Sequence, residues 1–281
     1  MVRSHFPLPN YKMRKEFLPK ILFVFVDLLD KFFLMICPIF YMSLTRAQDS
    51  NDRFTLGVEL IKKLNRNNEI NILDVGCGSG NFFIYLNASI KNFFYKGIDF
   101  NINQIKSSKI DKNNFKIFNQ DLRKNWFFGE FDFVWSSEVI EHIIDDNSFF
   151  ENLTKSTKKN GYIIITTPHY ESYINFADKF KWTKEVSKVE DGGHVKLGYN
   201  LNELENFAKK FDLKLIETYL ITECDNFRAK NLTEFNQGFK CYLFNVLYLL
   251  GFYKYKKFVS YKNADSKLKY YCIGAVYQKK N

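Results

Sequence analysis

The chain has 281 residues, 46% hydrophobic and 18% aromatic, a composition that supports a sizeable core and excludes wholesale disorder. Its formal net charge of +10 favours an anionic partner, such as nucleic acid, an acidic membrane surface or a phosphorylated or carboxylated substrate, without choosing among them. The five cysteines form no C-x-x-C pair, which argues against a disulfide framework and against structural zinc. A reducing, cytoplasmic setting follows.

The most apolar stretch covers residues 18–44. A membrane-spanning helix needs about 20 largely apolar residues, but Asp27, Asp30 and Lys31 interrupt this stretch, and Pro38 follows them. No small-residue cleavage site follows, so a secretory signal peptide is poorly supported. We predict an N-terminal helical cap, residues 1–52, whose apolar helix packs over the rest of the chain. The alternative is peripheral membrane association, or a subunit contact, through this helix.

From residue 53 onward, strand-like and helix-like segments alternate. Short apolar runs separated by helices are typical of a parallel sheet covered on both faces. We therefore predict one domain over residues 53–281, with an insertion at about 220–269 that contains an apolar helix at 241–253. Strands are predicted at 70–75, 93–99, 115–121, 131–137, 161–167, 213–219 and 270–277, and helices at 54–64, 82–90, 101–109, 145–158 and 201–211.

The segment "ILDVGCGSGNF", residues 72–82, places three glycines on alternate positions directly after a predicted strand. Glycines leave the backbone uncrowded, so we expect a bulky group to approach it closely. Such turns between the first strand and its helix bind nucleotides in open α/β sheets. The dinucleotide pattern G-x-G-x-x-G fails in both registers, because Asn81 or Phe83 stands where the third glycine is required.

The pattern that is present, Asp74-x-Gly76-x-Gly78-x-Gly80, resembles the first motif of the class I S-adenosylmethionine-dependent methyltransferases. The resemblance covers roughly residues 54–219 and the last strand. It implies an α/β fold: a Rossmann-like, seven-stranded, mostly parallel sheet with the last strand antiparallel. It also implies S-adenosylmethionine as the cofactor.

The same resemblance assigns cofactor-binding roles along the chain. Asp99, at the end of the second strand, stands where the family's ribose-binding acid is found, and a carboxylate there can accept hydrogen bonds from both ribose hydroxyls. Asp121 stands where the family reads the adenine amino group, and Leu122 would lie along the adenine. Asp74 would orient the turn or meet the methionine ammonium. Ser137, in the "FDFVWSSEVIEHI" segment that resembles the fourth motif, completes the set, with the backbone at Gly76 and Gly78 holding the amino acid part.

Taken singly, each of these features has a plainer explanation. A glycine turn can be an ordinary tight connection, and Asp99 or Asp121 can be a helix N-cap. The four landmarks in order are what favour the methyltransferase interpretation.

Methyl transfer is an in-line displacement, for which an enzyme aligns the acceptor and, where needed, removes its proton. Three histidines are candidate catalytic bases: His142, His169 and His194. The last two fall where the family's acceptor pocket usually forms, and a histidine near neutral pKa suits deprotonation of a hydroxyl. The alternative for each is a structural hydrogen bond.

Glu138, Glu141 and His142 have i, i+3 and i+4 spacing, which would place them on one face if the segment is helical. This E-x-x-E-H spacing is similar to that in ubiquinone-pathway O-methyltransferases, where such residues bind a divalent metal. The motif also occurs where it is merely structural. We predict no metal here, and take these three residues as the ligand set for the alternative.

Enzymes that methylate exocyclic amino groups of bases usually carry an Asn/Asp-Pro-Pro-Tyr/Phe signature after the fourth strand. This chain has "SSEV" there, so a nucleic-acid substrate is disfavoured. The "EVIEHI" and "TTPH" segments resemble the branch that O-methylates small molecules, sugars and lipid-linked intermediates, and the apolar helices fit a hydrophobic acceptor. Two alternatives remain. One is an RNA methyltransferase that stacks bases on the basic aromatic stretch 254–262, and the other is a non-catalytic cofactor-binding module that serves as a membrane or complex partner.

Overall fold

The computed structural model describes residues 48–100, 114–180, 183–190, 192–223, 257–265 and 269–281. The helix predicted at 101–109 and the apolar helices within 18–44 and 241–253 lie outside the described residues, as does nearly all of the predicted N-terminal cap.

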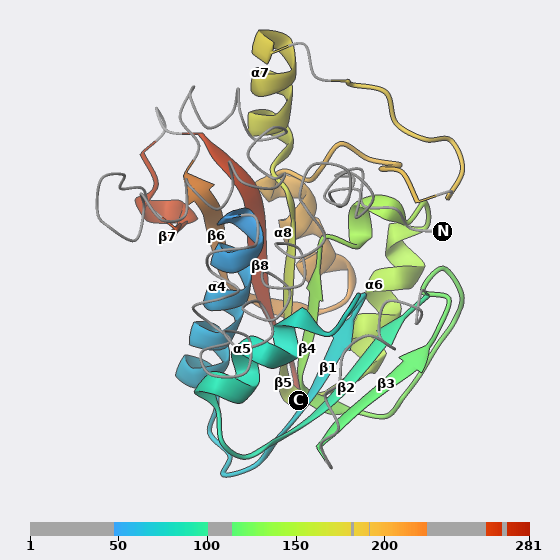
Figure 1. Cartoon of the computed structure of the whole chain (residues 1–281), viewed down its shortest axis with the longest axis vertical. Helices are drawn as coiled ribbons and strands as arrows, with labels where there is room; N and C mark the ends of the chain where they lie inside the picture. The colour runs from blue at the N-terminus through green and yellow to red at the C-terminus, as the bar shows by residue number, and fades with distance from the viewer. Residues whose placement is uncertain (1–47, 101–113, 181–182, 191, 224–256, 266–268) are drawn as a thin grey trace, which may run out of the picture.

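One mixed sheet organises the molecule, with its strands in the order β3-β2-β1-β4-β5-β8-β6-β7 (Figure 1). The first five strands pair in parallel, and β8 is antiparallel to both β5 and β6. The predicted fold class, Rossmann-like and mostly parallel with an antiparallel last strand, is confirmed. The strands are β1 (Ile70–Val75), β2 (Phe93–Asp99), β3 (Phe115–Asn119), β4 (Phe131–Ser137), β5 (Thr157–Pro168), β6 (Leu213–Glu223), β7 (Phe258–Ser260) and β8 (Tyr270–Lys279).

The described part of the sheet has eight strands rather than the predicted seven. The additional strand, β7, lies inside the predicted insertion and pairs with β6 at the sheet edge through Tyr219, Leu220 and Ile221. Its three residues are too few to show a periodic pattern, so this strand could not be predicted from the sequence.

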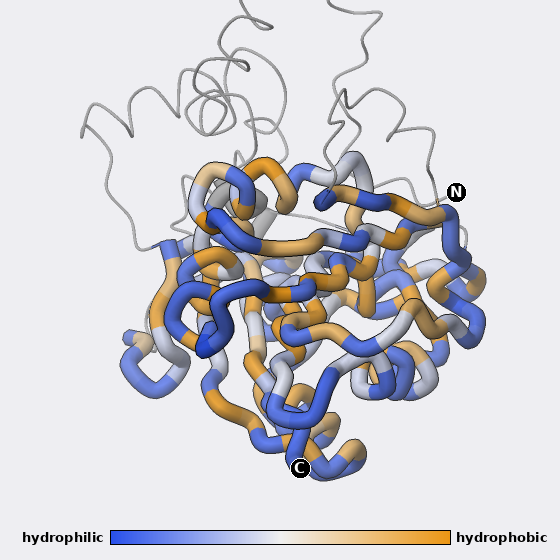
Figure 2. The backbone as a smooth tube through the Cα atoms, turned by 90° about the horizontal axis from the view of Figure 1, so that it is seen from below, coloured by the Kyte–Doolittle hydropathy of each residue, from blue (hydrophilic) through white to orange (hydrophobic). Residues whose placement is uncertain are grey.

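Helices cover both faces of the sheet, as the buried, apolar strands require. In β4, Val134 belongs to the apolar cluster with α6 and α8, whereas its neighbours Phe133 and Trp135 belong to the cluster with α4 and α5. Apolar segments therefore run through the interior of the chain trace (Figure 2). The helices are α4 (Gln48–Leu64), α5 (Asn81–Ser89), α6 (Asp146–Lys155), α7 (Tyr170–Phe180) and α8 (Leu201–Lys210), with short 3-10 helices η2 (Ile140–His142) and η3 (Tyr261–Asn263).

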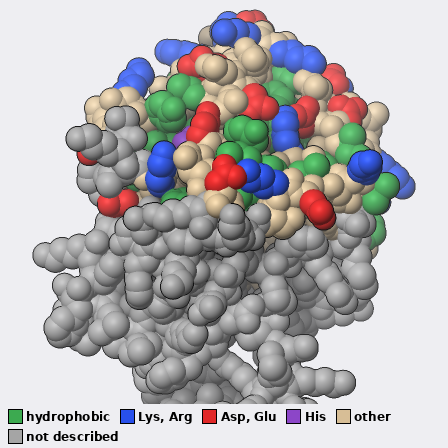
Figure 3. All heavy atoms as spheres, turned by 90° about the horizontal axis from the view of Figure 1, so that it is seen from above, with side chains coloured by type: hydrophobic (Ala, Val, Ile, Leu, Met, Phe, Trp, Pro, Cys, Tyr) green, Lys and Arg blue, Asp and Glu red, His purple; other side chains and the backbone are tan. Residues whose placement is uncertain are grey.

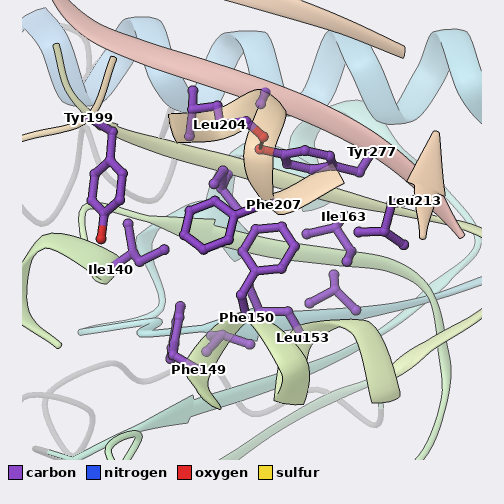
Figure 4. Packing of buried hydrophobic residues seen from close by; sticks show 14 of the residues in the cluster. Ile140, Phe149, Phe150, Leu153, Ile163, Tyr199, Leu204, Phe207, Leu213 and Tyr277 are labelled. Atoms are coloured by element: carbon purple, nitrogen blue, oxygen red, sulfur yellow. Dashed lines mark hydrogen bonds between the residues drawn. The ribbon is translucent and has the colours of Figure 1, made fainter. Parts of the chain in front are cut away.

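Aromatic contacts join the helices to the sheet on each side. Phe82 of α5 stacks on Trp135 of β4 with ring centroids 4.4 Å apart. On the opposite face, Phe150 of α6 stacks on Phe207 of α8 at 4.3 Å (Figure 4). The buried Tyr277 of β8 donates a hydrogen bond to the backbone carbonyl of Leu204 in the same cluster. These contacts hold the strand ends, and the loops that follow them, in fixed relative positions.

Two features of the helices differ from the sequence prediction. Helix α4 begins at Gln48, so the predicted boundary between residues 52 and 53 falls inside one helix. Helix α7 was not predicted; it begins two residues after β5 ends and stands above the sheet in Figure 1. Within the described residues, no helix is long and apolar enough to cross a membrane.

Candidate active site

The predicted site residues gather at one edge of the sheet. Strands β1 to β5 are parallel, so their carboxyl ends lie on the same side, where α/β proteins bind ligands. Asp99 is the last residue of β2, and the segments that follow the strand ends contain the glycine turn, Asp121, Glu138 and His169.

The glycine turn after β1 has a left-handed backbone at each glycine, with φ of 81° at Gly76, 52° at Gly78 and 76° at Gly80. The amides of Gly76 and Cys77 both donate to the carbonyl of Ile98, at 2.8 and 3.2 Å, which fixes the turn to the end of β2. Gly80 is also the N-cap residue of α5, so no side chain caps that helix. Side chains rarely adopt these φ values, which accounts for glycine at all three positions.

The three glycines differ in the space around them. A Cβ at Gly76 would lie 2.1 Å from Cγ2 of Val139, and one at Gly80 would lie 3.3 Å from the ring of Phe115. A Cβ at Gly78 would meet no atom of the described residues within 4 Å. The sequence-based expectation that the glycines leave room for a ligand therefore fits Gly78, whereas Gly76 leaves room for the protein's own Val139.

Asp99, at the end of β2, contacts this turn directly. Its Oδ2 accepts a hydrogen bond of 2.9 Å from the amide of Gly78. Asp99, the predicted ribose-binding acid, is thus in contact with Gly78, the glycine that has open space beside it. This contact supports the assignment of both residues to one binding site.

Asp74 is almost completely buried, and its Oδ2 accepts a hydrogen bond of 2.5 Å from the hydroxyl of Tyr95 on β2. Burial raises the pKa of Asp74 to about 7, the hydrogen bond from Tyr95 lowers it, and the nearby charge of Asp99 raises it. Asp74 thus contacts the side chain of Tyr95 on β2, and both of its predicted roles, orienting the turn or meeting the methionine ammonium, stay predictions.

Asp121, after β3, is bound by a residue that the sequence analysis did not select. Arg123 donates from Nε and NH2 to the two carboxylate oxygens of Asp121, each at 2.7 Å, and these hydrogen bonds hold the pKa of Asp121 below its usual range. The guanidinium also lies 5.6 Å from the ring centroid of the exposed Phe100. Leu122 is buried in the core. An adenine amino group at Asp121 would have to share the carboxylate with Arg123.

The segment after β4 departs from the predicted geometry. Ser137 Oγ lies 2.8 Å from Thr166 Oγ1 of β5. Glu138 then adopts a left-handed backbone with φ of 57°, and only residues 140–142 form a 3-10 helix. The segment is therefore not helical from Glu138 to His142, so the condition under which Glu138, Glu141 and His142 would share one helical face is not met. Glu138 Oε2 lies 3.4 Å from NH1 of Arg53, and its Oε1 accepts a long hydrogen bond of 3.6 Å from the thiol of Cys272.

Glu141 and His142 lie together with His194 instead. The rings of His142 and His194 meet edge to face, with centroids 4.7 Å apart. Glu141 is fully buried, and burial raises its pKa to about 7, although a hydrogen bond from Thr167 acts in the opposite direction. Burial lowers the pKa of His142 below its usual value. The structure thus joins two of the three predicted histidines in one cluster.

His169, the third candidate base, makes a separate set of contacts at the end of β5. Its Nδ1 lies 2.9 Å from Ser172 Oγ, and its Nε2 lies 2.8 Å from Glu171 Oε2 without the angles of a hydrogen bond. Burial lowers the pKa of His169, although Glu171 raises it. A neutral imidazole at the carboxyl edge is chemically able to accept a proton.

One segment, residues 183–199, crosses this edge; Asp191 within it is outside the described residues. The amides of Val195 and Lys196 donate to the carbonyl of Glu141, at 2.9 and 3.2 Å. Earlier in the segment, Glu190 Oε1 accepts a hydrogen bond of 2.7 Å from the amide of Ile144. The carbonyl of Glu190 accepts one of 3.3 Å from Arg123. The segment therefore contacts both the Asp121 side and the His142 side of the site.

The face seen from above Figure 1 has acidic and basic side chains interspersed, and a histidine reaches it between them (Figure 3). The described part of this face is not a continuous basic surface.

The sheet order, the glycine turn after β1 and the acid after β2 are together the arrangement of a class I methyltransferase. Residues 51–218 match the methyltransferase domain family, and the chain belongs to that family. The resemblance found in the sequence is thereby confirmed.

Individual relatives are distant. The chain is 22% identical over 157 residues to a malonyl-[acyl-carrier protein] O-methyltransferase of Bacillus anthracis, covering 53% of this chain and 57% of that protein. It is 23% identical over 168 residues to malonyl-[acyl-carrier protein] O-methyltransferase 2 of Ilyobacter polytropus, covering 57% and 58%. The chain thus spans less than two thirds of the length of these curated relatives.

Among solved structures, the fold is similar to an S-adenosylmethionine-dependent methyltransferase from Clostridium acetobutylicum. The TM-score is 0.52 and the identity 13%, with 82% of this chain and 92% of that chain covered. This likeness concerns the fold.

Proposed function

We propose that the protein transfers a methyl group from S-adenosylmethionine to an oxygen atom of a small-molecule, sugar or lipid-linked acceptor. The contact between Gly78 and Asp99 carries the cofactor part of the proposal. It combines a backbone position with open space and a carboxylate able to accept hydrogen bonds from ribose hydroxyls. The donor set at the turn fits the cofactor: Asp99 would hold the ribose, and the backbone at Gly76 and Gly78 the methionine part, with Asp74 orienting the turn.

Oxygen as the acceptor atom is supported by the O-methyltransferase activity in the names of both curated relatives. In the reaction, the acceptor oxygen forms a bond to the methyl carbon while the carbon–sulfur bond breaks and its electron pair stays on sulfur. A hydroxyl acceptor must also lose a proton, and we assign that proton to His169. A carboxylate acceptor needs no base, so the two acceptor classes differ in their dependence on His169.

The names of the relatives also indicate an acceptor attached to a carrier, a malonyl group on an acyl-carrier protein. We include carrier-linked carboxylates among the acceptors to be tested. A cytoplasmic location, with peripheral membrane contact as the alternative, remains our prediction from the sequence.

The test incubates the protein with methyl-labelled S-adenosylmethionine and an extract of its own cells, fractionated into lipid, small polar, glycan, protein and RNA pools. Label in the lipid, small polar, glycan or carrier-protein pool supports O-methylation if hydriodic acid releases it as methyl iodide under conditions that leave N-methyl groups intact. Base treatment then separates methyl esters, which hydrolyse, from methyl ethers, which do not. Label in RNA would contradict the proposal.

The matched control is the Asp99→Ala protein, which should label every pool more weakly than the native protein when the S-adenosylmethionine concentration is below the native Kd. If neither protein labels any pool but the native protein binds S-adenosylhomocysteine, the cofactor assignment stands and the acceptor assignment fails. Absence of S-adenosylhomocysteine binding would overturn the cofactor assignment as well.

A further inference from the structure

Arg123 contacts three parts of the candidate site, although the sequence analysis did not select it. Its guanidinium donates to both carboxylate oxygens of Asp121, after β3, and lies 5.6 Å from the ring centroid of Phe100, which directly follows Asp99. Its NH1 donates to the carbonyl of Glu190, in the segment that crosses this edge, at 3.3 Å. One side chain thus connects the two acids predicted to bind ribose and adenine with that segment.

The two acids stand at neighbouring strand ends. Strands β2 and β3 pair in parallel, and Asp99 at the end of β2 is the register partner of Asn119 at the end of β3. The amide of Gln120 donates to the carbonyl of Asp99 at 2.9 Å, which continues the pairing beyond β3. One nucleoside at this edge can therefore meet both Asp99 and Asp121.

The contacts of Asp121 use most of its capacity to accept hydrogen bonds. Oδ1 accepts from the amide of Arg123 at 3.2 Å and from its Nε at 2.7 Å, and Oδ2 accepts from NH2 at 2.7 Å. The ammonium of Lys124, 3.9 Å from Oδ2, is too distant for a hydrogen bond. An ionised carboxylate has about four lone-pair positions, two on each oxygen. Among the described residues, these contacts leave one position on Oδ2 for a donor.

The same contacts fix the direction of that remaining position. A bidentate pair between a guanidinium and a carboxylate is planar, and the amide of Arg123 holds the same carboxylate from a third direction. Without the guanidinium, Asp121 would retain only the hydrogen bond from this amide, and its carboxylate would be free to turn. A carboxylate that is fixed before binding need not be ordered when the ligand arrives.

The segment 183–199 supports the guanidinium from the other side. The carbonyl of Glu190 accepts from NH1, while Glu190 Oε1 accepts from the amide of Ile144 at 2.7 Å. Nε, NH1 and NH2 of Arg123 each have an acceptor, so the guanidinium cannot rotate without breaking a hydrogen bond. Arg123 is therefore itself held in place, although its side chain is 39% exposed.

We propose that Arg123 is a positioning residue that makes the site specific for adenine, because it holds Asp121 with one Oδ2 position directed at the exocyclic amino group of the cofactor. A purine with an oxygen in place of that amino group would oppose two acceptors and be repelled. This inference rests on the proposed function, since it requires the cofactor to bind at this edge. It goes beyond that function by assigning the choice of nucleobase to Arg123.

Isothermal titration calorimetry on the full-length protein compares S-adenosylhomocysteine with S-inosylhomocysteine, which has an oxygen in place of the amino group. We expect the native protein to prefer the adenine ligand by about 10-fold or more. Arg123→Ala should weaken S-adenosylhomocysteine binding and reduce the preference to about threefold or less, because the released carboxylate turns away from either base. Arg123→Lys keeps the positive charge without the bidentate geometry, so it should also lose most of the preference.

Lys124→Ala is the matched control, because it removes a cation beside the same carboxylate that makes no hydrogen bond to it. It should keep the preference within about twofold, and circular dichroism establishes that each variant is folded. A folded Arg123→Ala protein that keeps the native preference, or binds S-adenosylhomocysteine more tightly, would overturn the role of Arg123. Equal binding of both ligands by the native protein would overturn it while the cofactor assignment stands. Binding of neither would overturn the proposed function and this inference together.

Discussion

The amide of Gly78 donates to Oδ2 of Asp99 across 2.9 Å, which joins the turn after β1 to the acid at the end of β2. Asp99 therefore has two roles: it holds the turn in place and, in our proposal, accepts hydrogen bonds from the ribose. Substitutions at this position can separate the two.

We expect Asp99→Ala to weaken S-adenosylhomocysteine binding by about 1–3 kcal/mol, roughly 5- to 150-fold in Kd, the range for hydrogen bonds to a charged group. Asp99→Asn retains an oxygen that can accept from the Gly78 amide, so it should lose less. Isothermal titration calorimetry measures both. Unchanged affinity in folded Asp99→Ala would place the ribose elsewhere.

The contact between Gly76 and Val139 gives a prediction about stability. Gly76→Ala combines a left-handed backbone with a Cβ placed 2.1 Å from Val139 Cγ2, so it should destabilise the protein by about 2–5 kcal/mol. Gly78→Ala has the backbone strain without the clash, and should cost about 1–2 kcal/mol. Urea unfolding measures both variants.

Val139→Ala supplies the double-mutant cycle. Removing the Val139 methyl groups should recover part of the Gly76→Ala loss, whereas it should leave the Gly78→Ala loss unchanged. Strictly additive losses for Gly76 and Val139 would contradict the packing explanation.

The raised pKa of Asp74 should make the free energy of unfolding depend on pH. Its pKa is raised to about 7 in the folded protein from 3.8, so the folded state binds more protons than the unfolded state between these values. Stability therefore falls as pH rises from about 4 to about 7, and changes little above 7 on account of this group. Asp74→Asn should remove this contribution, at most about 1.4 kcal/mol per pH unit.

Urea unfolding of the native protein and Asp74→Asn at pH 5 and pH 7.5 tests the effect. Glu141, whose pKa is also raised to about 7, leaves a residual slope of the same sign. Tyr95→Phe is the informative companion. It removes the hydrogen bond that favours the ionised form, so the pH at which stability levels off should rise. Identical pH profiles for the native protein and Asp74→Asn would show that Asp74 titrates normally.

If His169 is the base, its substitution should change both kcat and the pH–rate profile. With a hydroxyl acceptor, His169→Ala should lower kcat by about 10²- to 10⁴-fold while S-adenosylhomocysteine affinity stays the same. Burial lowers the pKa of His169, so the acidic limb of the native pH–rate profile should lie below 6.5 and disappear in the variant. Ser172→Ala removes the contact at Nδ1 together with the hydrogen bond that Ser172 Oγ accepts from the amide of Tyr270, and it should have a smaller effect on kcat and keep the limb.

With a carboxylate acceptor, which needs no base, we expect His169→Ala to leave kcat almost unchanged. Full turnover with an identified hydroxyl acceptor would remove His169 from the mechanism.

The sequence predicted the central strands well, because strands buried on both faces are apolar runs that end at turns; β1 and β2 have the predicted bounds. Arg123 could also have been found, since it stands two residues after the predicted Asp121. The pair of His142 and His194 could not, because only the folded path of the segment 183–199 joins residues so distant in the chain. The position of Glu138 was missed because its spacing implies a helical face, whereas its positive φ turns it toward Arg53.

The path of the segment 183–199 has a consequence for the order of events in catalysis. Arg123 beside Asp121 contacts the carbonyl of Glu190, and later in the segment the amide of Tyr199 donates to the carbonyl of Pro168, next to His169. A ligand on either side that fixes this backbone favours the arrangement that the other side requires, and the energetic benefit is reciprocal. We therefore expect the methyl donor and the acceptor to bind cooperatively. When one product leaves, the protein should bind the other product less tightly.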